Sequence, residues 1–331
     1  MTETLQIALE AQGSLPNFRY DVILPLIHGR VNIEGVTLNP SAPMEAAGYY
    51  DKAKFKDGEF GLIDTNIGDI VPAIDSGWKI TCLPVFIKRK PVFNYLWVRT
   101  DRGINSPKDL EGKLFASVGY GSTITIYTRG FLQHHHGVDI TKLRWLLNGA
   151  HKFELHGQQP EITIATGPAK APWQRLLDGE VDAVTGDITD SKAWSLLESS
   201  SSVRRMFTNY REMNEELIRK YHIFTPVHAI AMSSTLDQAN QGLSRKLYDA
   251  FAESKDLAYD DHLSDKASSS MILYSRETMR DQAASYGDIY AYGVNANRDA
   301  METYFQYTQE QGITKSLMTM ERFFAKDTLN T

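Results

Sequence analysis

Short apolar runs and segments with helical periodicity alternate along most of this chain, separated by glycine, proline or small polar residues. The short apolar runs, which predict strands, lie at 4–9, 31–38, 60–63, 79–86, 93–99, 114–116, 143–147, 161–165, 181–184 and 223–232. The segments of helical character lie at 22–27, 44–56, 67–76, 124–134, 173–177 and 212–220, and helix predominates after 233 apart from an interruption at 286–293. This alternation predicts an α/β protein whose helices cover the faces of a sheet.

The turn at 117–122 is the stretch that most clearly suggests a ligand. Small residues lead from an apolar run into a helical segment that Ser122 or Thr123 can cap. The first backbone N–H groups of a helix have no partner inside the helix, so that end attracts an anion, with carboxylate the favoured type. An ordinary strand-to-helix turn has the same appearance, and this alternative stays open.

Three polar stretches follow predicted strands at their carboxyl ends. In the turn described above, Gly119 and Gly121 would let a ligand approach the main chain, and Tyr120 between them could stack on a ring. The stretches 64–66 and 185–187 occupy similar positions after other strands. Ligands of open α/β sheets bind beyond the carboxyl ends of the strands, so these stretches are candidates for one site.

Composition narrows the class of protein. The chain has 331 residues, of which 42% are hydrophobic and 23% charged, which is typical of a globular protein and long enough for two domains. The net charge is −6 and the largest basic run is the three residues 88–90, so nucleic acid is not expected as a partner. The single cysteine, Cys82, lies among apolar residues and excludes an internal disulfide.

Neither a membrane nor a metal is expected from the sequence. The first residues form no secretion signal and no apolar run approaches membrane-spanning length, so we expect a cytoplasmic protein. The triplet His134, His135 and His136 invites a metal interpretation. Adjacent helical residues point about 100° apart and cannot converge on one ion, so we expect no metal site there.

Several segments resemble the 4,5-dihydroxyphthalate decarboxylase family, and they occur in the same order along the chain. The matching segments are GRVNIEGVTL (29–38), SPKDLEGK (106–113), TRGFLQHHHGVD (128–139), LLDGEVDAV (176–184), VRRMF (203–207), YHIFTPVHAIAM (221–232) and YGVNANRDAMETYFQYTQEQGI (292–313). Each is weak alone, but their shared order extends the resemblance from about residue 20 to 324. It implies a two-lobed α/β fold similar to type 2 periplasmic binding proteins, with a ligand cleft between the lobes.

The resemblance also implies where the lobes and the cleft lie. One lobe would contain 1–99 and 226–331, and the other 100–225. The cleft would be lined by 64–66, 117–123, 185–187 and His228.

The sequence departs from the family pattern at positions where that pattern has charged residues. Val22 and Leu24 stand in place of two arginines, and Val92 and Phe93 in place of an arginine and a histidine. Gly119 stands in place of an acidic residue. Arginine is the natural bidentate partner of a carboxylate, so these changes predict a less charged and more apolar substrate than 4,5-dihydroxyphthalate.

The resemblance implies a cofactor-independent decarboxylase, a carbon–carbon lyase. Removing CO2 from an electron-rich aromatic acid requires a proton on the ring carbon that carries the carboxylate, and donors that hold the carboxylate. His228 matches the family's strand histidine and is the candidate acid, because histidine ordinarily titrates near neutral pH. A core histidine bonded to backbone is the alternative. Asp64 would accept a phenol proton or cap the following helix.

The remaining candidate residues would bind the substrate. Those assigned to this role are Asn66, Arg89, Phe93, Tyr120, Gly121, Ser122, Thr123 and Asp187. Several have a structural alternative. Arg89 could equally be in a solvated basic turn, and Tyr120 could pack on the other lobe. Ser122 and Thr123 could be a plain cap, and Asp187 could only begin a loop. We expect Arg129 to form a structural ion pair.

Two other functions stay open alongside the decarboxylase. The same fold commonly binds an organic acid without chemistry, and the cleft could support another cofactor-free lyase or isomerase step. The predicted partner in every case is a small carboxylic acid, and a homodimer is left open.

Overall fold

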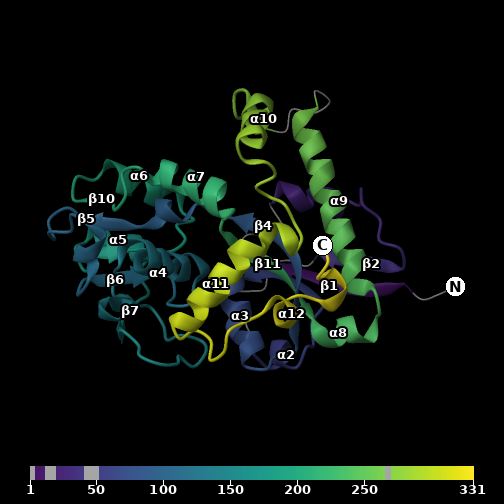
Figure 1. Ribbon diagram of the computed structural model, residues 1–331, viewed down its shortest axis with the longest axis horizontal. Coiled ribbons are helices and arrows are strands. Elements are labelled where there is room, and N and C mark those ends of the chain that lie inside the picture. Colours follow the sequence, from purple (N-terminus) through teal and green to yellow (C-terminus); the bar gives the residue numbers. More distant parts are fainter. Residues whose placement is uncertain (1–3, 12–19, 41–51, 265–269) are drawn as a thin grey trace. The chain divides into compact units, whose positions relative to one another are not determined.

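The computed structural model describes residues 4–11, 20–40, 52–264 and 270–331. Its internal contacts divide the chain into two units. Unit 1 contains Met1–Arg89, Tyr221–Glu302 and Thr319–Thr331, and unit 2 contains Lys90–Lys220 and Thr303–Met318. Each unit holds one sheet, and the elements are labelled in Figure 1.

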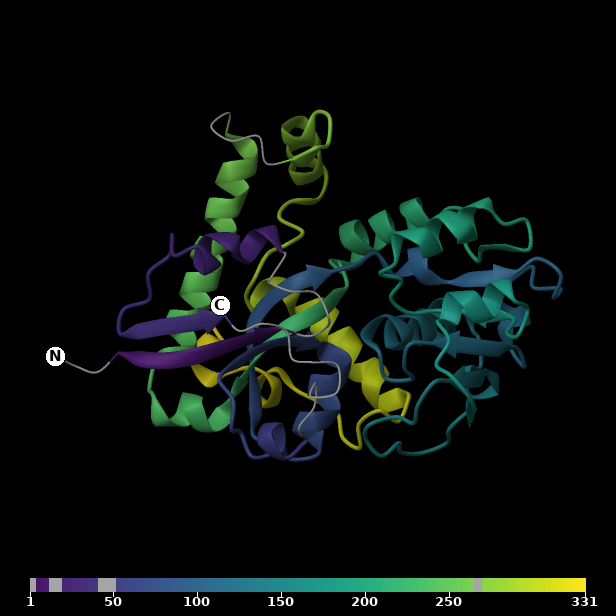
Figure 2. The ribbon, with the colours of Figure 1, turned by 180° about the vertical axis from the view of Figure 1, so that it is seen from behind.

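The sheet of unit 1 has five strands in the order β2-β1-β3-β11-β4. Its strands are β1 (Leu5–Ala11), β2 (Val36–Pro40), β3 (Leu62–Asn66), β4 (Ile80–Arg89) and β11 (Pro226–Ser233). Strand β1 is parallel to β2 and β3, whereas β11 is antiparallel to both of its neighbours. The purple β1 lies beside β2 in the rear view of Figure 2. Every residue of β11 is buried, as expected for a central strand covered on both faces.

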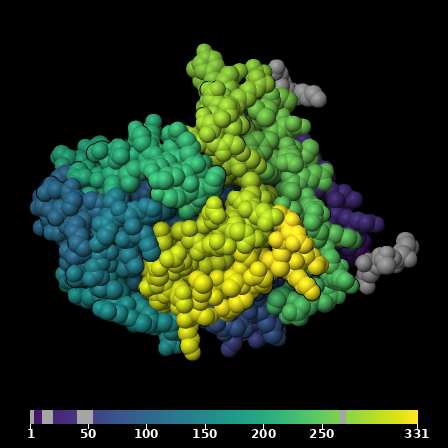
Figure 3. All heavy atoms as spheres, viewed as in Figure 1, coloured from purple at the N-terminus to yellow at the C-terminus, as the bar shows by residue number. Residues whose placement is uncertain are grey.

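Helices cover this sheet and complete its core. They are η1 (Asp21–Ile23), α1 (Leu24–Ile27), α2 (Lys52–Lys56), α3 (Ile67–Asp75), α8 (Ser234–Ala239), α9 (Leu243–Leu263), α10 (Ser275–Tyr286), η5 (Asn295–Asn297), α12 (Met320–Phe323) and η6 (Lys326–Thr328). Helix α9 packs its Leu247 and Phe251 into the core around Leu62 and Ile230. Helix α10 has no buried residue, and its yellow-green atoms lie at the surface in Figure 3.

The sheet of unit 2 has six strands in the order β10-β5-β9-β6-β7-β8. Its strands are β5 (Trp97–Arg99), β6 (Leu114–Ser117), β7 (Arg144–Leu147), β8 (Glu161–Ile164), β9 (Ala183–Val184) and β10 (Val203–Arg205). The helices are η2 (Val92–Tyr95), η3 (Pro107–Leu110), α4 (Thr123–His136), η4 (Ile140–Lys142), α5 (Pro172–Leu177), α6 (Ser191–Ser199) and α7 (Tyr210–Tyr221). Strands β9, β6, β7 and β8 are parallel, and β5 is antiparallel to both β9 and β10.

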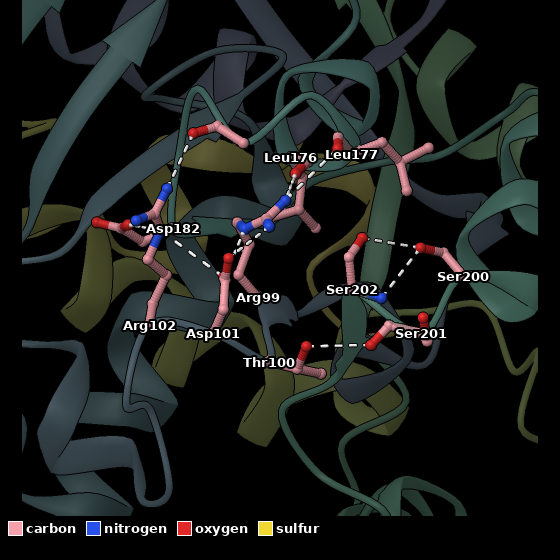
Figure 4. Close-up of polar contacts among 11 residues, drawn as sticks. Arg99, Thr100, Asp101, Arg102, Leu176, Leu177, Asp182, Ser200, Ser201 and Ser202 are labelled. Atoms are coloured by element: carbon pink, nitrogen blue, oxygen red, sulfur yellow. Dashed lines mark hydrogen bonds and ion pairs between the residues drawn. The ribbon is translucent and has the colours of Figure 1, made fainter.

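The units divide at other positions than the lobes implied by the resemblance, which were 1–99 with 226–331 and 100–225. Residues 90–99 belong to unit 2 because β5 pairs with β9 and β10. Figure 4 shows the end of that strand, where the Arg99 guanidinium bonds to Asp101 and to the carbonyls of Leu176 and Leu177.

The long helix α11 (Arg298–Glu310) accounts for the other difference. Its second half belongs to unit 2, because the rings of Tyr304 and Tyr307 pack on Tyr127 of α4. Tyr307 also lies against Gly130, where an added Cβ would overlap the tyrosine ring. The tyrosines of α11 therefore contribute to the core of unit 2.

Most predicted elements are present, with boundaries that differ by a few residues. The predicted strand 31–38 begins only at Val36, because Gly35 has a positive φ and ends a turn. The predicted strand 93–99 is a 3₁₀ turn followed by the three-residue β5. Helix α6 was not predicted. Residues 44–51 of the helix predicted at 44–56 lie outside the described residues.

Among the described residues, no helix combines the length and the apolar character needed to cross a membrane.

Candidate functional site

A row of polar side chains crosses the centre of the unit 1 sheet. In the strand register, His228 of β11 pairs with Asn66 of β3 on one side and with Lys88 of β4 on the other. Residues paired across antiparallel strands point to the same face, and so does Asp64, two positions before Asn66. Four polar groups from three neighbouring strands are therefore presented on one face.

The pairing of β11 with β4 is irregular next to His228. The register passes from His228 opposite Lys88 to Ile230 opposite Leu83, so β4 contributes extra residues there. One of them is Pro84, which has no N–H to give to a ladder. Irregularities of this kind bend a strand and re-aim a side chain, and they are frequent beside functional sites.

Asp64 and His228 form a buried hydrogen-bonded pair. Oδ1 of Asp64 lies 2.8 Å from Nδ1 of His228, and the two residues are 1% and 5% exposed. The alternative in which Asp64 caps α3 is wrong, because Asn66 is the capping residue and accepts from the Gly68 N–H at 2.9 Å. His228 is buried, as in the alternative of a core histidine, but its Nδ1 bonds to the Asp64 carboxylate and not to backbone.

Lys88 fixes the proton position on the imidazole. Its Nζ lies 3.4 Å from Nε2 of His228, and an ammonium group can only donate. In this arrangement Nε2 accepts, Nδ1 carries the hydrogen, and the hydrogen is donated to Asp64. The imidazole thus lies between a carboxylate and an ammonium group, a common arrangement for proton transfer.

Arg89, the next residue along β4, donates its hydrogen bonds to other groups of the protein. Its guanidinium donates to the carbonyls of Phe224 and Ala291, each at 2.9 Å, and to the side chain of Asn297. Arg89 is 7% exposed, so the alternative of a solvated basic turn is wrong. The guanidinium holds the loop before α11 against the end of β4.

The predicted anion-binding turn of unit 2 has the expected backbone. Helix α4 begins at Thr123, with Ser122 in the extended conformation of a capping residue. The Ser122 hydroxyl bonds to Thr125 Oγ1 at 2.7 Å instead of to a backbone N–H. Within the described residues, the N–H groups of Ile124 and Thr125 have no acceptor. The N-terminus of α4 thus has free N–H donors in its first turn.

A histidine occupies the space at Gly121 that we expected a ligand to use. An added Cβ on Gly121 would overlap the His151 ring, whereas Gly119 has open space. Burial, followed by the charges of Arg129 and Lys152, lowers the pKa of His151 to about 4. The close approach that glycine permits here is therefore to a neutral imidazole of the same unit.

Tyr120 is buried within unit 2 and lies beneath Arg129. The guanidinium carbon is 3.8 Å from the centre of the Tyr120 ring, and Nη1 donates to the Tyr120 carbonyl at 2.8 Å. Trp145 meets the same tyrosine ring edge to face at 5.6 Å. Tyr120 therefore packs inside its own unit.

The loop after β9 lies against the same turn of unit 2. A Cβ on Gly186 would come within 3.0 Å of Ser117 Oγ, and Thr185 bonds to Thr128 of α4 at 2.9 Å. Asp187 is held by Lys90, so it does more than begin a loop. Phe93 is in the unit 2 core, with its ring 5.3 Å from those of Phe131 and Phe207.

The histidine triplet ends α4, two residues beyond the predicted segment 124–134, and Gly137 follows in the left-handed conformation. The three rings have different surroundings. His134 bonds to Glu310 at 2.6 Å, His135 lies beside Phe131, and His136 stacks on Phe207.

The candidates fall into two groups. Asp64, Asn66, Arg89 and His228 belong to unit 1, whereas Phe93, Tyr120, Gly121, Ser122, Thr123 and Asp187 belong to unit 2. Sequence reasoning missed Lys88, which lies two positions after the end of the predicted strand 79–86 but inside the observed β4. It also missed His151 and Trp145.

Unit 1 also contains a cavity of about 410 Å³ that none of these candidates lines. Its walls come from η1, α9, α10 and the segments beside them, and include Val22, Tyr259, Met279 and Tyr290. Val22 is one of the positions at which the sequence departs from the family pattern.

Comparison with known proteins identifies distant homologues of this chain and solved structures with a similar fold. No family model matches the chain. The chain is 25% identical over 324 residues to 4,5-dihydroxyphthalate decarboxylase of Comamonas testosteroni, which covers 95% of this chain and 96% of that protein. It is 28% identical over 178 residues to 4,5-dihydroxyphthalate decarboxylase of Pseudomonas putida, which covers 50% of this chain and 67% of that protein. The chain is thus a distant full-length homologue of this decarboxylase.

Solved structures agree with the predicted fold class. The chain is similar to the periplasmic sulfonate-binding protein SsuA of Methylobacillus flagellatus (TM-score 0.56, 12% identity, 98% of this chain and 92% of that one). It is also similar to the ligand-binding component of an ABC-type import system of Staphylococcus aureus (TM-score 0.53, 10% identity, 98% of both chains). The fold is that of the type 2 periplasmic binding proteins, with two mixed sheets, which confirms the predicted class.

Proposed function

We propose that this protein is a cofactor-independent decarboxylase of a hydroxylated aromatic or polyketide-like carboxylic acid. The observation that carries the proposal is the buried Asp64–His228 pair with Lys88 at the second imidazole nitrogen. Full-length homology to a decarboxylase supports the reaction class. The proposed chemistry needs only residues of unit 1.

In the proposed reaction His228 supplies a proton to carbon. Nε2–H of the imidazolium transfers its proton to the ring carbon that carries the carboxylate, while the phenol oxygen donates electrons into the ring. The carbon–carboxylate bond then breaks, its electron pair restores the aromatic ring, and CO2 leaves. The neutral imidazole regains a proton from water, so the proton is the only co-reactant.

Asp64 and Lys88 would prepare the imidazole for this step. The Asp64 carboxylate fixes the ring orientation through Nδ1 and stabilises the imidazolium. Lys88 donates to Nε2 in the absence of substrate, and an anionic substrate would compete for its ammonium group. Moving Lys88 to the substrate leaves Nε2 free to carry the proton that the ring carbon receives.

The substrate is proposed to be less charged than 4,5-dihydroxyphthalate. Val22, Leu24, Val92 and Phe93 stand where the family pattern has cations, and Arg89 already donates to protein acceptors. A substrate with one carboxylate would need fewer cations than a phthalate with two.

The test is to incubate the protein with hydroxylated aromatic acids in D2O, following CO2 release and deuterium at the vacated carbon. We expect turnover that persists with a chelator and falls about 10²- to 10⁴-fold in H228Q and in D64N. The matched control is H134Q, since His134 also bonds to a carboxylate, that of Glu310. It should keep full activity.

The alternative function is a binding protein that holds an organic acid without chemistry, which the similarity to the sulfonate-binding protein SsuA and to a ligand-binding component of an import system would suggest. Saturable binding of an aromatic acid with no product from any candidate would favour this function. Turnover that is unchanged in H228Q would also exclude the proposed mechanism.

A further inference from the structure

Arg129 is a completely buried cation without a carboxylate partner. Its Nε donates to Gln311 Oε1 at 2.7 Å and its Nη1 to the Tyr120 carbonyl, whereas Nη2 has no hydrogen-bond partner. Two other buried cations have carboxylate partners, Arg175 with Glu180 and Lys255 with Asp288. A buried charge normally has a counter-charge, so the guanidinium of Arg129 with its unpartnered Nη2 requires a reason.

Two more buried nitrogen atoms near Arg129 have no partner. They are Nε1 of Trp145 and Nε2 of His151. Trp145 is completely buried, and its ring centre is 5.3 Å from the Arg129 guanidinium carbon. The His151 ring centre is 6.3 Å from that of Tyr120, which also contacts Arg129 and Trp145. The three residues that carry these unsatisfied nitrogens therefore all lie against the Tyr120 ring.

These groups lie at the beginning of α4. Side chains of a helix point toward its N-terminus, and Arg129 accordingly reaches back to the Tyr120 carbonyl, two residues before Ser122. The free N–H groups of Ile124 and Thr125 are in the first turn of the same helix. Guanidinium, indole and backbone N–H groups can donate but not accept, so an acceptor-only ligand would satisfy them.

We propose that Arg129, Trp145 and His151, with the first turn of α4, form an oxyanion-binding site inside unit 2. The ligand chemistry is a small oxyanion such as the carboxylate of an organic acid or an inorganic phosphate or sulfate. Helix N-termini and guanidinium groups both bind such ions. The proposal concerns unit 2 only and does not depend on His228 or on decarboxylation.

His151 would move when the anion enters. Its ring rests on Gly121 and is held neutral beside Arg129 and Lys152. An anion would offset these two cations and raise the pKa of His151, so the imidazole could become a further donor. Anion binding should therefore tighten as the pH falls below 6.

The experiment follows the indole N–H signals of the full chain by ¹⁵N NMR during titration with acetate, benzoate, phosphate or sulfate. Chloride at equal ionic strength is the reference. Variants W145F and W194F assign the signals, and Trp194 is the matched control because its Nε1 already donates to Ile188. We expect a saturable shift of the Trp145 signal and none of the Trp194 signal.

Affinity should fall at least tenfold in R129Q and severalfold in W145F, but not in W194F. A preference for acetate and benzoate would identify a carboxylate site, and a preference for phosphate or sulfate a tetrahedral-anion site. The absence of a saturable Trp145 shift with any anion would overturn the proposal and leave buried water as the partner of these nitrogens. If R129Q does not fold, the titration of the parent protein decides alone.

Discussion

One region in each unit buries charged groups, and the two regions do so in opposite ways. In unit 1 the carboxylate of Asp64 bonds to His228, and the other imidazole nitrogen meets Lys88, so each group has a partner. In unit 2 the guanidinium of Arg129 is fully buried, donates to neutral acceptors and keeps one nitrogen unpartnered. Both regions lie near a point where a strand leads into a helix. In unit 1 strand β3 leads into α3, and in unit 2 strand β6 leads into α4.

This difference separates two roles that buried polar groups can have. A paired set such as Asp64 and His228 holds a proton in a defined place, which suits chemistry. An unpaired set such as Arg129 and its neighbours can bind a ligand that supplies the missing negative charge. The following variants test this contrast, because each changes the paired groups of unit 1, the unpaired groups of unit 2 or a control residue.

The largest effect on stability is expected from breaking the unit 1 pair. Replacing His228 by leucine leaves the Asp64 carboxylate buried without its donor, which should lower the free energy of unfolding by about 3–5 kcal/mol at pH 7. Urea unfolding measures this loss. The double variant D64L/H228L removes both partners and should recover most of the loss.

The exposed pair of His134 and Glu310 provides the control for this loss. Its side chains are about one third exposed, so H134L should change stability by less than about 1 kcal/mol. Equal losses in H228L and H134L would contradict the contrast between buried and exposed pairs.

The next largest effect concerns pH and His151. Its pKa is lowered from 6.5 to about 4 in the folded protein, so the unfolded chain binds more protons between these values. The free energy of unfolding should therefore be fully maintained above pH 6.5 and fall by roughly 3 kcal/mol as the pH drops to 4. Comparing urea unfolding of the parent and H151Q from pH 7.5 to 4.5 isolates this contribution.

A parent protein whose pH dependence equals that of H151Q would show that His151 titrates normally. Adding the anion found by NMR should reduce the loss at low pH, because an anion beside Arg129 raises the pKa of His151. This second measurement connects the pH effect to the proposed site of unit 2.

The alternation of strands and helices predicted the fold class because burial patterns are local properties of a sequence. The apolar segment 223–232 covers all of β11 except its last residue, Ser233. Helix α6 escaped detection because its sequence is largely polar and only Ala193 and Leu197 are buried.

The candidate site could be predicted only in part, since its members are far apart in the sequence. His228 came from a family resemblance, and no spacing rule joins it to Asp64, 164 positions earlier. Lys88 was overlooked because it begins a basic run, and only the strand register turns it toward His228. Arg129 was expected in an ion pair, which is wrong because Gln311 and the Tyr120 carbonyl are its partners.

A smaller effect distinguishes two close glycine contacts in unit 2. A Cβ on Gly130 would overlap the buried ring of Tyr307, and G130A should cost about 1–3 kcal/mol. A Cβ on Gly121 would overlap His151, which is partly exposed and can rotate away, so G121A should cost less. Thermal unfolding measures both. The reverse order would mean that His151 is held as rigidly as the core, against its proposed movement.

The smallest net effect is expected at Arg129, despite its complete burial. R129M removes hydrogen bonds to Gln311 and to the Tyr120 carbonyl and the contact with the Tyr120 ring, each a loss of roughly 1 kcal/mol or more. It also removes an unpaired buried charge, whose desolvation costs several kcal/mol. These contributions oppose each other, so urea unfolding should place R129M within about 1 kcal/mol of the parent.

R129K tests the reason for this near balance. Lysine keeps a charge at the same place but lacks the planar fork that reaches both acceptors. If desolvated charge is the unfavourable contribution, R129K should be less stable than R129M, although lysine is chemically closer to arginine. A more stable R129K would mean that the cation itself stabilises the ligand-free protein, and the contrast between the two units would then disappear.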